Sequence, residues 1–276
     1  MMTGRHTVEQ RHTVEGTDPG LFVDVHEPAN DAGLRPVLLI HGFSSSSKLN
    51  WGDSGWISTL TKAGRRVITV DLPGHGRSHA PEDLDSYTPS RIRADLLQIV
   101  FDAGAKPLQD GNPASGLDII GYSLGSRLAW EFAATQPDLV HRVVLGGPSA
   151  ADPLAAFDLA AAQRYLADGT PIDDESTAGL LKMASALPSN NLFAMLSLIE
   201  AIKGEPFDPA EAAPHVPLLL VAGEKDERAA TMAELAELAG QRGGSLVETL
   251  VIPGRTHTNV VTSRAFKDAA VEFLGV

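Results

Sequence analysis

The sequence contains no cysteine among its 276 residues. Disulfide bonds, thiolate metal sites and a cysteine nucleophile are therefore excluded, and the absence fits a reducing compartment. No window approaches the roughly 18 consecutive apolar residues that a membrane-spanning helix requires. The N-terminal stretch "MMTGRHTVEQRHTVEG" also lacks the apolar run of a signal peptide. These absences predict a cytoplasmic protein without a membrane span.

Basic residues are scarce relative to acidic ones. Lys and Arg total 22 against 35 Asp and Glu, which gives a formal net charge of −13. Such a charge repels phosphate backbones and anionic lipid surfaces, so nucleic acid is not an expected partner. Hydrophobic residues at 43% and charged residues at 21% lie near the globular norm and far from disordered chains. The chain is therefore expected to fold by itself.

Short apolar runs alternate with helix-like stretches along most of the chain. The runs are β-branched and bounded by Gly or Pro, as is typical of strands buried on both faces; they span 36–42, 65–74, 117–123, 142–148, 217–226 and 246–254. The helix-like stretches have apolar residues at three- and four-residue spacing and span 56–64, 90–104, 126–137, 231–242 and 263–275. "RHTVE" occurs at 5–9 and again at 11–15, which indicates an exposed edge strand whose hairpin partner is "LFVDVHEP" at 21–28. The pattern predicts an α/β fold with a mostly parallel central sheet of about eight strands, helices on both faces, and ligands at the carboxyl ends of the strands.

One interval breaks the alternation. From 149 to 214 the sequence shows only helical patterns, which predicts a core domain of residues 1–148 and 215–276 with a helical cap of residues 149–214 inserted into it. The apolar residues of the insertion exceed what small free helices should expose; they include Phe157, Leu159, Leu180, Leu181, Met183, Phe193, Met195 and Leu196. We expect these helices to pack down as a lid. The alternative is that they are further helices covering the sheet.

Residues 121–126 read "GYSLGS", directly after the apolar run "LDII" and directly before the helix-like "RLAWEFAA". Gly121, Ser123 and Gly125 fit the pattern G-x-S-x-G, in which a serine occupies a sharp strand-to-helix turn and side chains at the flanking positions would collide. Serine is also a favoured helix N-cap, so the motif alone does not identify a nucleophile.

A serine nucleophile needs a base and a group that orients the base. His257 follows the predicted strand at 246–254, and Asp226 ends the run at 217–226, so both should lie on the same side of the sheet as Ser123. Rival acids are Glu224, Glu227 and Asp152.

Five motifs together resemble the α/β-hydrolase fold superfamily, in the order that this family places them. They are "HGF" at 41–43, "DLPGHGRS" at 71–78, "GYSLGS" at 121–126, "GEKD" at 223–226 and "GRTH" at 254–257, and the resemblance covers essentially the whole chain. It implies that Ser123 is the nucleophile, that His257 is the general base and acid, and that Asp226 fixes the tautomer of His257. Some members of the family place the acid soon after an earlier strand, where this chain has Asp152.

The same resemblance assigns supporting roles. The backbone N–H groups of Phe43 and Leu124 would form the oxyanion hole. His41 would support the oxyanion loop, and His75 would support a turn behind the site. "GHGRSH" at 74–79 also looks like half of a dinucleotide fingerprint, but His79 replaces its third glycine, so no cofactor and no metal are expected.

A serine at the elbow favours acyl chemistry over the chemistry of epoxide hydrolases and haloalkane dehalogenases, which have a carboxylate there. Carboxylic ester hydrolysis through an acyl-enzyme is the favoured reaction. Lactonase, thioesterase, carbon–carbon bond hydrolase and perhydrolase reactions use similar triads and stay open. A small-molecule binding protein with a repurposed triad is the non-enzyme alternative.

The composition of the insertion predicts a mainly apolar pocket for a small or medium acyl substrate. The residues that we expect to line it are His41, Tyr122, Phe157, Met183, Phe193 and Met195. Arg127, Arg164 and Arg255 are candidates to bind a substrate carboxylate. The chain is expected to be a monomer or a homodimer.

Overall fold

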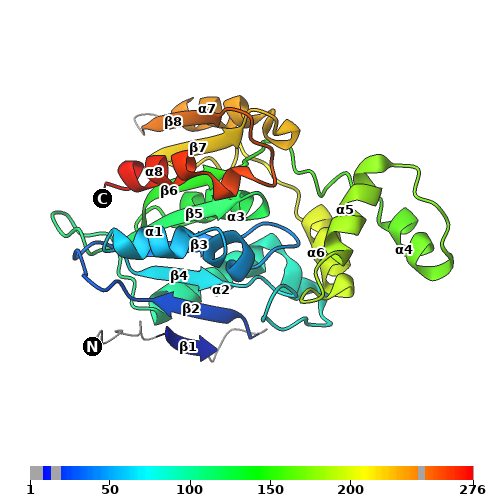
Figure 1. The fold of residues 1–276 in the computed structure, drawn as a ribbon, viewed down its shortest axis with the longest axis horizontal. Helices are drawn as coiled ribbons and strands as arrows, with labels where there is room; N and C mark the ends of the chain where they lie inside the picture. Colours follow the sequence, from blue (N-terminus) through cyan, green and yellow to red (C-terminus); the bar gives the residue numbers. More distant parts are fainter. Residues whose placement is uncertain (1–8, 14–19, 242–245, 276) are drawn as a thin grey trace, which may run out of the picture.

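The computed structural model describes residues 9–13, 20–241 and 246–275. Its centre is an eight-stranded sheet in the order β1-β2-β4-β3-β5-β6-β7-β8 (Figure 1). The strands are β1 (Glu9–Thr13), β2 (Phe22–His26), β3 (Val37–Ile40), β4 (Val67–Val70), β5 (Leu117–Tyr122), β6 (Val140–Gly146), β7 (Leu218–Gly223) and β8 (Val247–Ile252). The predicted α/β fold with about eight strands is confirmed.

The sheet is parallel except at one edge. β1 pairs antiparallel with β2, and β2 pairs antiparallel with β4, whereas the neighbouring strands from β4 to β8 all run parallel. The N-terminal hairpin is therefore confirmed for its described residues; the rest of the predicted edge strand, at 5–8 and 14–15, lies outside the described part of the chain.

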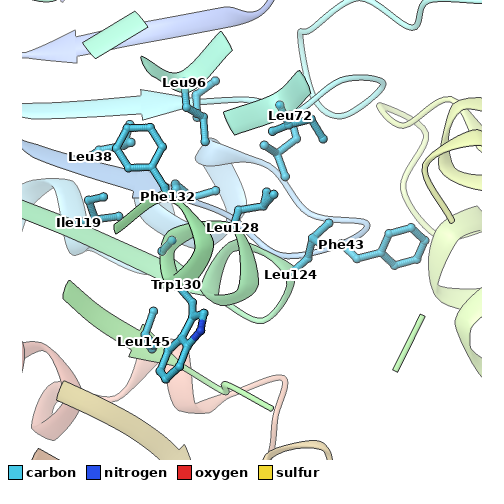
Figure 2. Close-up of a cluster of buried hydrophobic side chains, with 14 of the residues drawn as sticks. Leu38, Phe43, Leu72, Leu96, Ile119, Leu124, Leu128, Trp130, Phe132 and Leu145 are labelled. Atoms are coloured by element: carbon cyan, nitrogen blue, oxygen red, sulfur yellow. The ribbon is translucent and has the colours of Figure 1, made fainter. Parts of the chain in front are cut away.

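Both faces of the sheet are covered by helices. Successive residues of the buried strands point to opposite sides, so each face presents apolar side chains that must be packed against. Leu38 and Ile40 of β3 join the larger apolar cluster, and Val37 and Leu39 of the same strand join the smaller one. The larger cluster includes residues of α2 (Pro89–Asp102), α3 (Leu124–Thr135) and α7 (Met232–Gln241). The smaller cluster includes residues of α1 (Trp56–Lys62) and α8 (Arg264–Phe273). Figure 2 shows how side chains of α3 pack against those of the strands in the larger cluster.

Three helices occupy the interval that breaks the strand and helix alternation. They are α4 (Leu159–Asp168), α5 (Glu175–Ser185) and α6 (Leu192–Gly204), and the side chains of Asp158, Asp174 and Asn191 accept hydrogen bonds from backbone N–H groups at their N-termini. Figure 1 places them together on the right, beyond the carboxyl ends of the strands. α6 buries seven residues, whereas α4 buries only Ala162, so α6 is the helix that attaches this group to the rest of the molecule.

The carboxyl ends of the strands bring distant parts of the sequence to one edge of the sheet. The loop at 41–43 follows β3, Ser123 follows β5, Asp226 follows β7 and His257 follows β8. These strands are consecutive or nearly so in the sheet, in the order β3-β5-β6-β7-β8. The fold therefore gathers the predicted site residues at one edge. No helix in the described residues is long and apolar enough to cross a membrane.

Candidate active site

Ser123 occupies a strained turn between β5 and α3. Its backbone has φ 54° and ψ −115°, and Ser44 is the one other described non-glycine residue with a positive φ. An L-residue pays roughly 1–3 kcal/mol for such a conformation, so surrounding contacts must hold it. The Ser123 N–H donates to the carbonyl of Gly146 at 2.8 Å, and the Ser123 carbonyl accepts from the N–H of Ser126 at 2.8 Å.

The two flanking glycines are required by close backbone approach. A Cβ on Gly121 would lie 2.2 Å from the carbonyl oxygen of Gly125, and a Cβ on Gly125 would lie 2.0 Å from that of Ile40. Both distances are far below van der Waals contact. The start of α3 therefore packs directly on the ends of β3 and β5, which fixes where the Ser123 side chain emerges.

The structure brings Ser123, His257 and Asp226 together. His257 Nε2 lies 2.9 Å from Ser123 Oγ, and His257 Nδ1 lies 2.8 Å from Asp226 Oδ2. Asp226 accepts at its other oxygen from the N–H groups of Arg228 at 3.1 Å and Ala229 at 3.3 Å. Because the carboxylate accepts hydrogen bonds, His257 carries its proton on Nδ1 and offers the lone pair of Nε2 to the serine hydroxyl.

Two neighbours fix the imidazole of His257. The phenol of Tyr122 donates a hydrogen bond to the His257 carbonyl, and burial raises the pKa of that phenol, so it stays a neutral donor. Gly147 has φ 58°, and a Cβ there would lie 2.8 Å from Cε1 of His257. The ring therefore fits against β6 because residue 147 has no side chain.

The loop after β3 is held by two buried histidines. Nε2 of His41 accepts from the N–H of Leu72 at 3.0 Å, and its Nδ1 donates to the carbonyl of Gly42 at 2.8 Å. Nε2 of His75 accepts from the N–H of Ser44 at 3.1 Å, and its Nδ1 donates to the carbonyl of Pro73 at 2.9 Å. Burial lowers the pKa of both rings, that of His75 to about 3, so both are neutral.

Phe43 and Leu124, whose N–H groups are the expected oxyanion donors, line the same cavity as Ser123 and His257. Leu124 is the first residue of α3, so its N–H has no acceptor within the helix. Phe43 N–H donates to none of the backbone carbonyls in the described loops, although the N–H of Gly42 donates to Asn50 Oδ1 at 2.9 Å. Two uncommitted N–H groups beside a serine hydroxyl can stabilise the negative charge of a tetrahedral intermediate.

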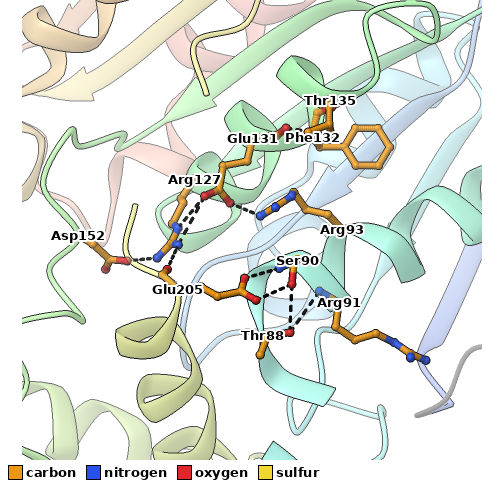
Figure 3. A network of polar contacts seen from close by, with 10 residues as sticks. All are labelled: Thr88, Ser90, Arg91, Arg93, Arg127, Glu131, Phe132, Thr135, Asp152 and Glu205. Atoms are coloured by element: carbon orange, nitrogen blue, oxygen red, sulfur yellow. Dashed lines mark hydrogen bonds and ion pairs between the residues drawn. The ribbon is translucent and has the colours of Figure 1, made fainter. Parts of the chain in front are cut away.

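The rival acids lie elsewhere in the site or outside it. Asp152 pairs with Arg127, which also contacts Glu131 at 3.4 Å and donates to the carbonyl of Glu205 (Figure 3). Glu224 is exposed and accepts from the N–H of Gly254 at 2.8 Å, and Glu227 is exposed. In this geometry Asp226 is the carboxylate that contacts His257.

A cavity of about 190 Å³ opens beside Ser123 and His257. Its apolar wall comes from the core and from the segment at 149–214; contributing residues include Phe43, Trp130, Leu154, Leu180, Met183 and Phe207. Of the six residues that the sequence placed in the pocket, Tyr122 and Met183 line the cavity.

The other four residues do not line it, and that part of the prediction is corrected. His41 is fully buried under the oxyanion loop, and Phe157 and Met195 are buried in the apolar cluster that attaches the helical segment. Phe193 points to solvent, with 77% of its surface exposed. The helical pattern located an apolar stripe correctly but carried no information on which partner each side chain meets.

Several residues at the cavity were missed or left unplaced by sequence reasoning. Arg127 lines the cavity, Arg164 is exposed on α4, and Arg255 is half-buried outside the lining. Asn50 and Arg228 also line it, and neither stands in a motif that indicated a role. Gly147 belongs to the "GGP" that ends the fourth apolar run, at 142–148, a pair of glycines that could have indicated a close approach.

The described residues contain no group of three or more His, Asp or Glu side chains arranged to hold a metal ion. Of the charged groups that line the cavity, Arg127 is paired with Asp152, and the carboxylate of Asp226 is bound to His257 at the cavity wall.

The sequence is similar to those of curated hydrolases. An epoxide hydrolase of Caballeronia sordidicola is 31% identical over 116 residues, which are 42% of this chain and 31% of that protein. A 2-hydroxy-6-oxononadienedioate/2-hydroxy-6-oxononatrienedioate hydrolase of Paraburkholderia phymatum is 30% identical over 162 residues, 55% of this chain and 51% of that protein. The chain spans about half or less of the length of the curated relatives it matches.

Solved structures show the same fold. A carboxylesterase structure from Nitrososphaera gargenis superposes with a TM-score of 0.71 over 96% of this chain and 97% of its own, at 17% identity. The model of the family described as "alpha/beta hydrolase fold" matches residues 35–212, well over half of the sequence. Because the family model matches more than half of the chain, the chain belongs to the α/β-hydrolase fold family of hydrolases.

Proposed function

We propose that this chain is a serine hydrolase that cleaves carboxylic esters of small to medium, mainly apolar acyl groups through an acyl-enzyme. The observation that carries the proposal is the continuous relay from Ser123 Oγ through His257 to Asp226, with contacts of 2.9 and 2.8 Å, at the wall of a cavity. Both contacts lie within hydrogen-bond reach, as a nucleophile, base and orienting acid require.

The first half of the reaction forms an ester on the protein. Ser123 Oγ attacks the substrate carbonyl carbon while His257 Nε2 takes the hydroxyl proton. The carbonyl oxygen becomes an oxyanion, which the N–H groups of Phe43 and Leu124 stabilise. When the tetrahedral intermediate collapses, the bond to the alcohol breaks and His257 returns the proton to the departing oxygen. Asp226 stays ionised and stabilises the imidazolium.

The second half releases the acid. His257 takes a proton from a water molecule, whose oxygen attacks the acyl carbon, and the same N–H groups hold the second oxyanion. Collapse breaks the bond to Ser123 Oγ, which recovers its proton from His257. Both halves use the same residues, so no further group is required.

The shape of the cavity supports the substrate class. About 190 Å³ of space with a mostly apolar wall accommodates a short or medium acyl chain. We further propose that residues 149–214 act as the cap of this site. Leu154, Leu180 and Met183 of that segment face the cavity, so replacing them should alter which acyl groups are accepted.

A carbon–carbon bond hydrolase is the second candidate. The relative from Paraburkholderia phymatum is named for a substrate with a ketone and two carboxylates but no ester, so its hydrolysis breaks a carbon–carbon bond. Epoxide hydrolysis is disfavoured despite the relative of that name, because this chain has a serine where that chemistry uses a carboxylate. A binding protein has no need of an aligned base, so the intact relay disfavours that alternative.

The test is a substrate panel. p-Nitrophenyl acetate, butyrate and octanoate, a lactone, a thioester and a vinylogous diketone are compared by kcat/KM with wild type and Ser123→Ala. We expect the highest value for a p-nitrophenyl ester of short or medium acyl chain, and none above background for the variant. A dominant value for the diketone would move the assignment to carbon–carbon hydrolysis. Tight binding of these compounds without turnover of any of them would contradict the proposal that this chain is an enzyme.

A further inference from the structure

Ser44 shares an unusual feature with Ser123. These are the two described non-glycine residues with positive φ, at 53° for Ser44 and 54° for Ser123. The strain at Ser123 is explained by the elbow, but Ser44 lies in the loop after β3 and takes no part in the relay. Strain of this kind persists only where neighbouring contacts impose it. The contacts of Ser44 therefore identify the interactions that hold this loop in its conformation.

The backbone N–H of Ser44 is held by a buried histidine of the core. Its N–H donates to Nε2 of His75 at 3.1 Å. His75 is buried and neutral, with its pKa lowered to about 3 by burial, and its Nδ1 donates to the carbonyl of Pro73. The acceptor for the Ser44 N–H is therefore present across the pH range in which the protein would be assayed.

The side chain of Ser44 is held by residues of the helical segment at 149–214. Its hydroxyl donates to the carbonyl of Met183 in α5 at 2.8 Å and accepts from the amide of Asn190 at 3.4 Å. The carbonyl of Met183 lies in the last turn of α5, where it also accepts from the N–H of Ala186 at 3.2 Å. The side chain of Met183 faces the cavity, so the same residue contacts the substrate space and holds Ser44.

These contacts bracket the peptide that carries the Phe43 N–H. The peptide before it is held because Gly42 N–H donates to Asn50, and the peptide after it is held because Ser44 N–H donates to His75. The peptide between them has its N–H uncommitted, and its Gly42 carbonyl accepts from Nδ1 of His41 at 2.8 Å. Its orientation is thus set by that hydrogen bond and by its two fixed neighbours, and the neighbour that follows it is strained and tied to α5.

We propose that Ser44 is a positioning residue that couples the seating of α5 over the cavity to the orientation of the Phe43 N–H. The oxyanion donor then points into the site only while α5 is in place. When α5 moves away, the hydroxyl of Ser44 loses its acceptor, the strained backbone relaxes, and the Phe43 peptide turns about the hydrogen bond that its carbonyl end accepts from His41. This inference rests on the proposed function, because it concerns the donor that stabilises the oxyanion.

The experiment compares Ser44→Ala and Ser44→Gly with wild type. Alanine removes the hydroxyl but still carries the energetic cost of this φ, so its backbone relaxes away from it, whereas glycine removes the hydroxyl and adopts this φ without strain. We expect kcat of Ser44→Ala to fall at least tenfold with KM within threefold, and kcat of Ser44→Gly to fall by less but more than twofold. Affinity for an alkyl trifluoromethyl ketone, whose adduct with Ser123 places an oxyanion in the hole, should fall at least tenfold in Ser44→Ala.

Ser185→Ala is the matched control. Its hydroxyl also donates to a carbonyl of α5, that of Leu181 at 2.8 Å, but it does not connect α5 to the oxyanion loop. We expect its kcat and ketone affinity to stay within twofold of wild type. A kcat within twofold of wild type in either Ser44 variant would overturn the coupling, as would an equal loss in Ser185→Ala.

Hydrogen exchange separates failure of this inference from failure of the proposed function. Ser44→Ala should exchange faster than wild type in the peptides covering 40–47, and Ser185→Ala should not. If wild type hydrolyses no ester, the proposed function fails, yet faster exchange at 40–47 still supports the coupling. Unchanged exchange there overturns it whatever the activity.

Discussion

The core and the proposed cap differ in how closely neighbouring atoms pack around their glycines. On the core wall, a Cβ on Gly125 would lie 2.0 Å from backbone and one on Gly147 would lie 2.8 Å from His257. On the proposed cap, a Cβ on the solvent-exposed Gly179 of α5 would meet nothing within 4 Å. The residues proposed for bond-making are thus held where no added atom fits, whereas the outer side of α5 leaves room. The difference predicts that added side-chain atoms are tolerated on the outer side of α5 and not at the strand ends.

The carboxylates on the two walls give the largest expected contrast. Asp226→Asn should lower kcat by about 10⁴, because an amide stabilises the wrong tautomer of His257. Asp152→Asn should change kcat by less than tenfold, because Asp152 pairs with Arg127 and not with the base. Steady-state kinetics on one ester compares them. If Asp152→Asn lost most of its activity while Asp226→Asn stayed active, Asp152 would be the carboxylate that orients His257.

Gly147→Ala tests the close packing around His257. An added methyl group at a positive φ and 2.8 Å from the ring must displace the imidazole from Ser123. We expect a loss of about 100-fold in kcat, and a larger separation between Nε2 and Oγ in a crystal structure of the variant. Activity within a few fold of wild type would mean that the ring has space that the structure does not show.

The buried histidines of the core wall predict a pH dependence of stability. The pKa of His75 is lowered from 6.5 to about 3, so below pH 6.5 the unfolded chain takes up a proton that the folded chain refuses. Stability is therefore retained above pH 6.5 and is lost as the pH falls toward 3. His75→Gln should reduce the slope of unfolding free energy against pH by up to about 1.4 kcal/mol per unit between pH 4 and 6.

Denaturant titrations at several pH values measure that slope. Ser185→Ala is the control, because Ser185 is exposed and the substitution removes no titratable group, so it should leave the slope unchanged. Equal slopes in wild type and His75→Gln would contradict a buried neutral His75.

The smallest effect is expected for a glycine of the cap. Gly179→Ala should raise the free energy of unfolding by up to about 1 kcal/mol, because alanine favours the helix and has space there. Gly125→Ala should lower it by about 1–3 kcal/mol, because the methyl group overlaps the Ile40 carbonyl. Denaturation of both variants checks the sign. Changes in unfolding free energy of the same sign in both variants would contradict the difference in packing between the core and the proposed cap.

The features predicted from the sequence are those set by local pattern. Strands and helices followed from apolar periodicity, and Ser123, Asp226 and His257 followed from their positions after predicted strands, which parallel pairing then brings to one edge. The π-helix at Lys48–Gly52, which carries Asn50, has no such pattern and was not predicted.

The contacts between distant segments were the part that pattern could not supply. Phe193 and Leu196 lie three residues apart on the same side of α6, yet Leu196 is buried and Phe193 is 77% exposed. Which of the acids near the site pairs with Arg127 and which with His257 likewise depends on the packing of the chain between 149 and 214 against α3. Ser44 could not be singled out, because its strain exists only when α5 and His75 hold it.

The most direct test of the proposed chemistry is covalent labelling with a fluorophosphonate, followed by intact mass and peptide mapping. Attack by an activated serine displaces fluoride and leaves a stable phosphonate ester. The account predicts one adduct per chain on Ser123, none in Ser123→Ala, and labelling at least 100-fold slower in His257→Ala. An adduct on another residue, or equal labelling rates in wild type and His257→Ala, would contradict it.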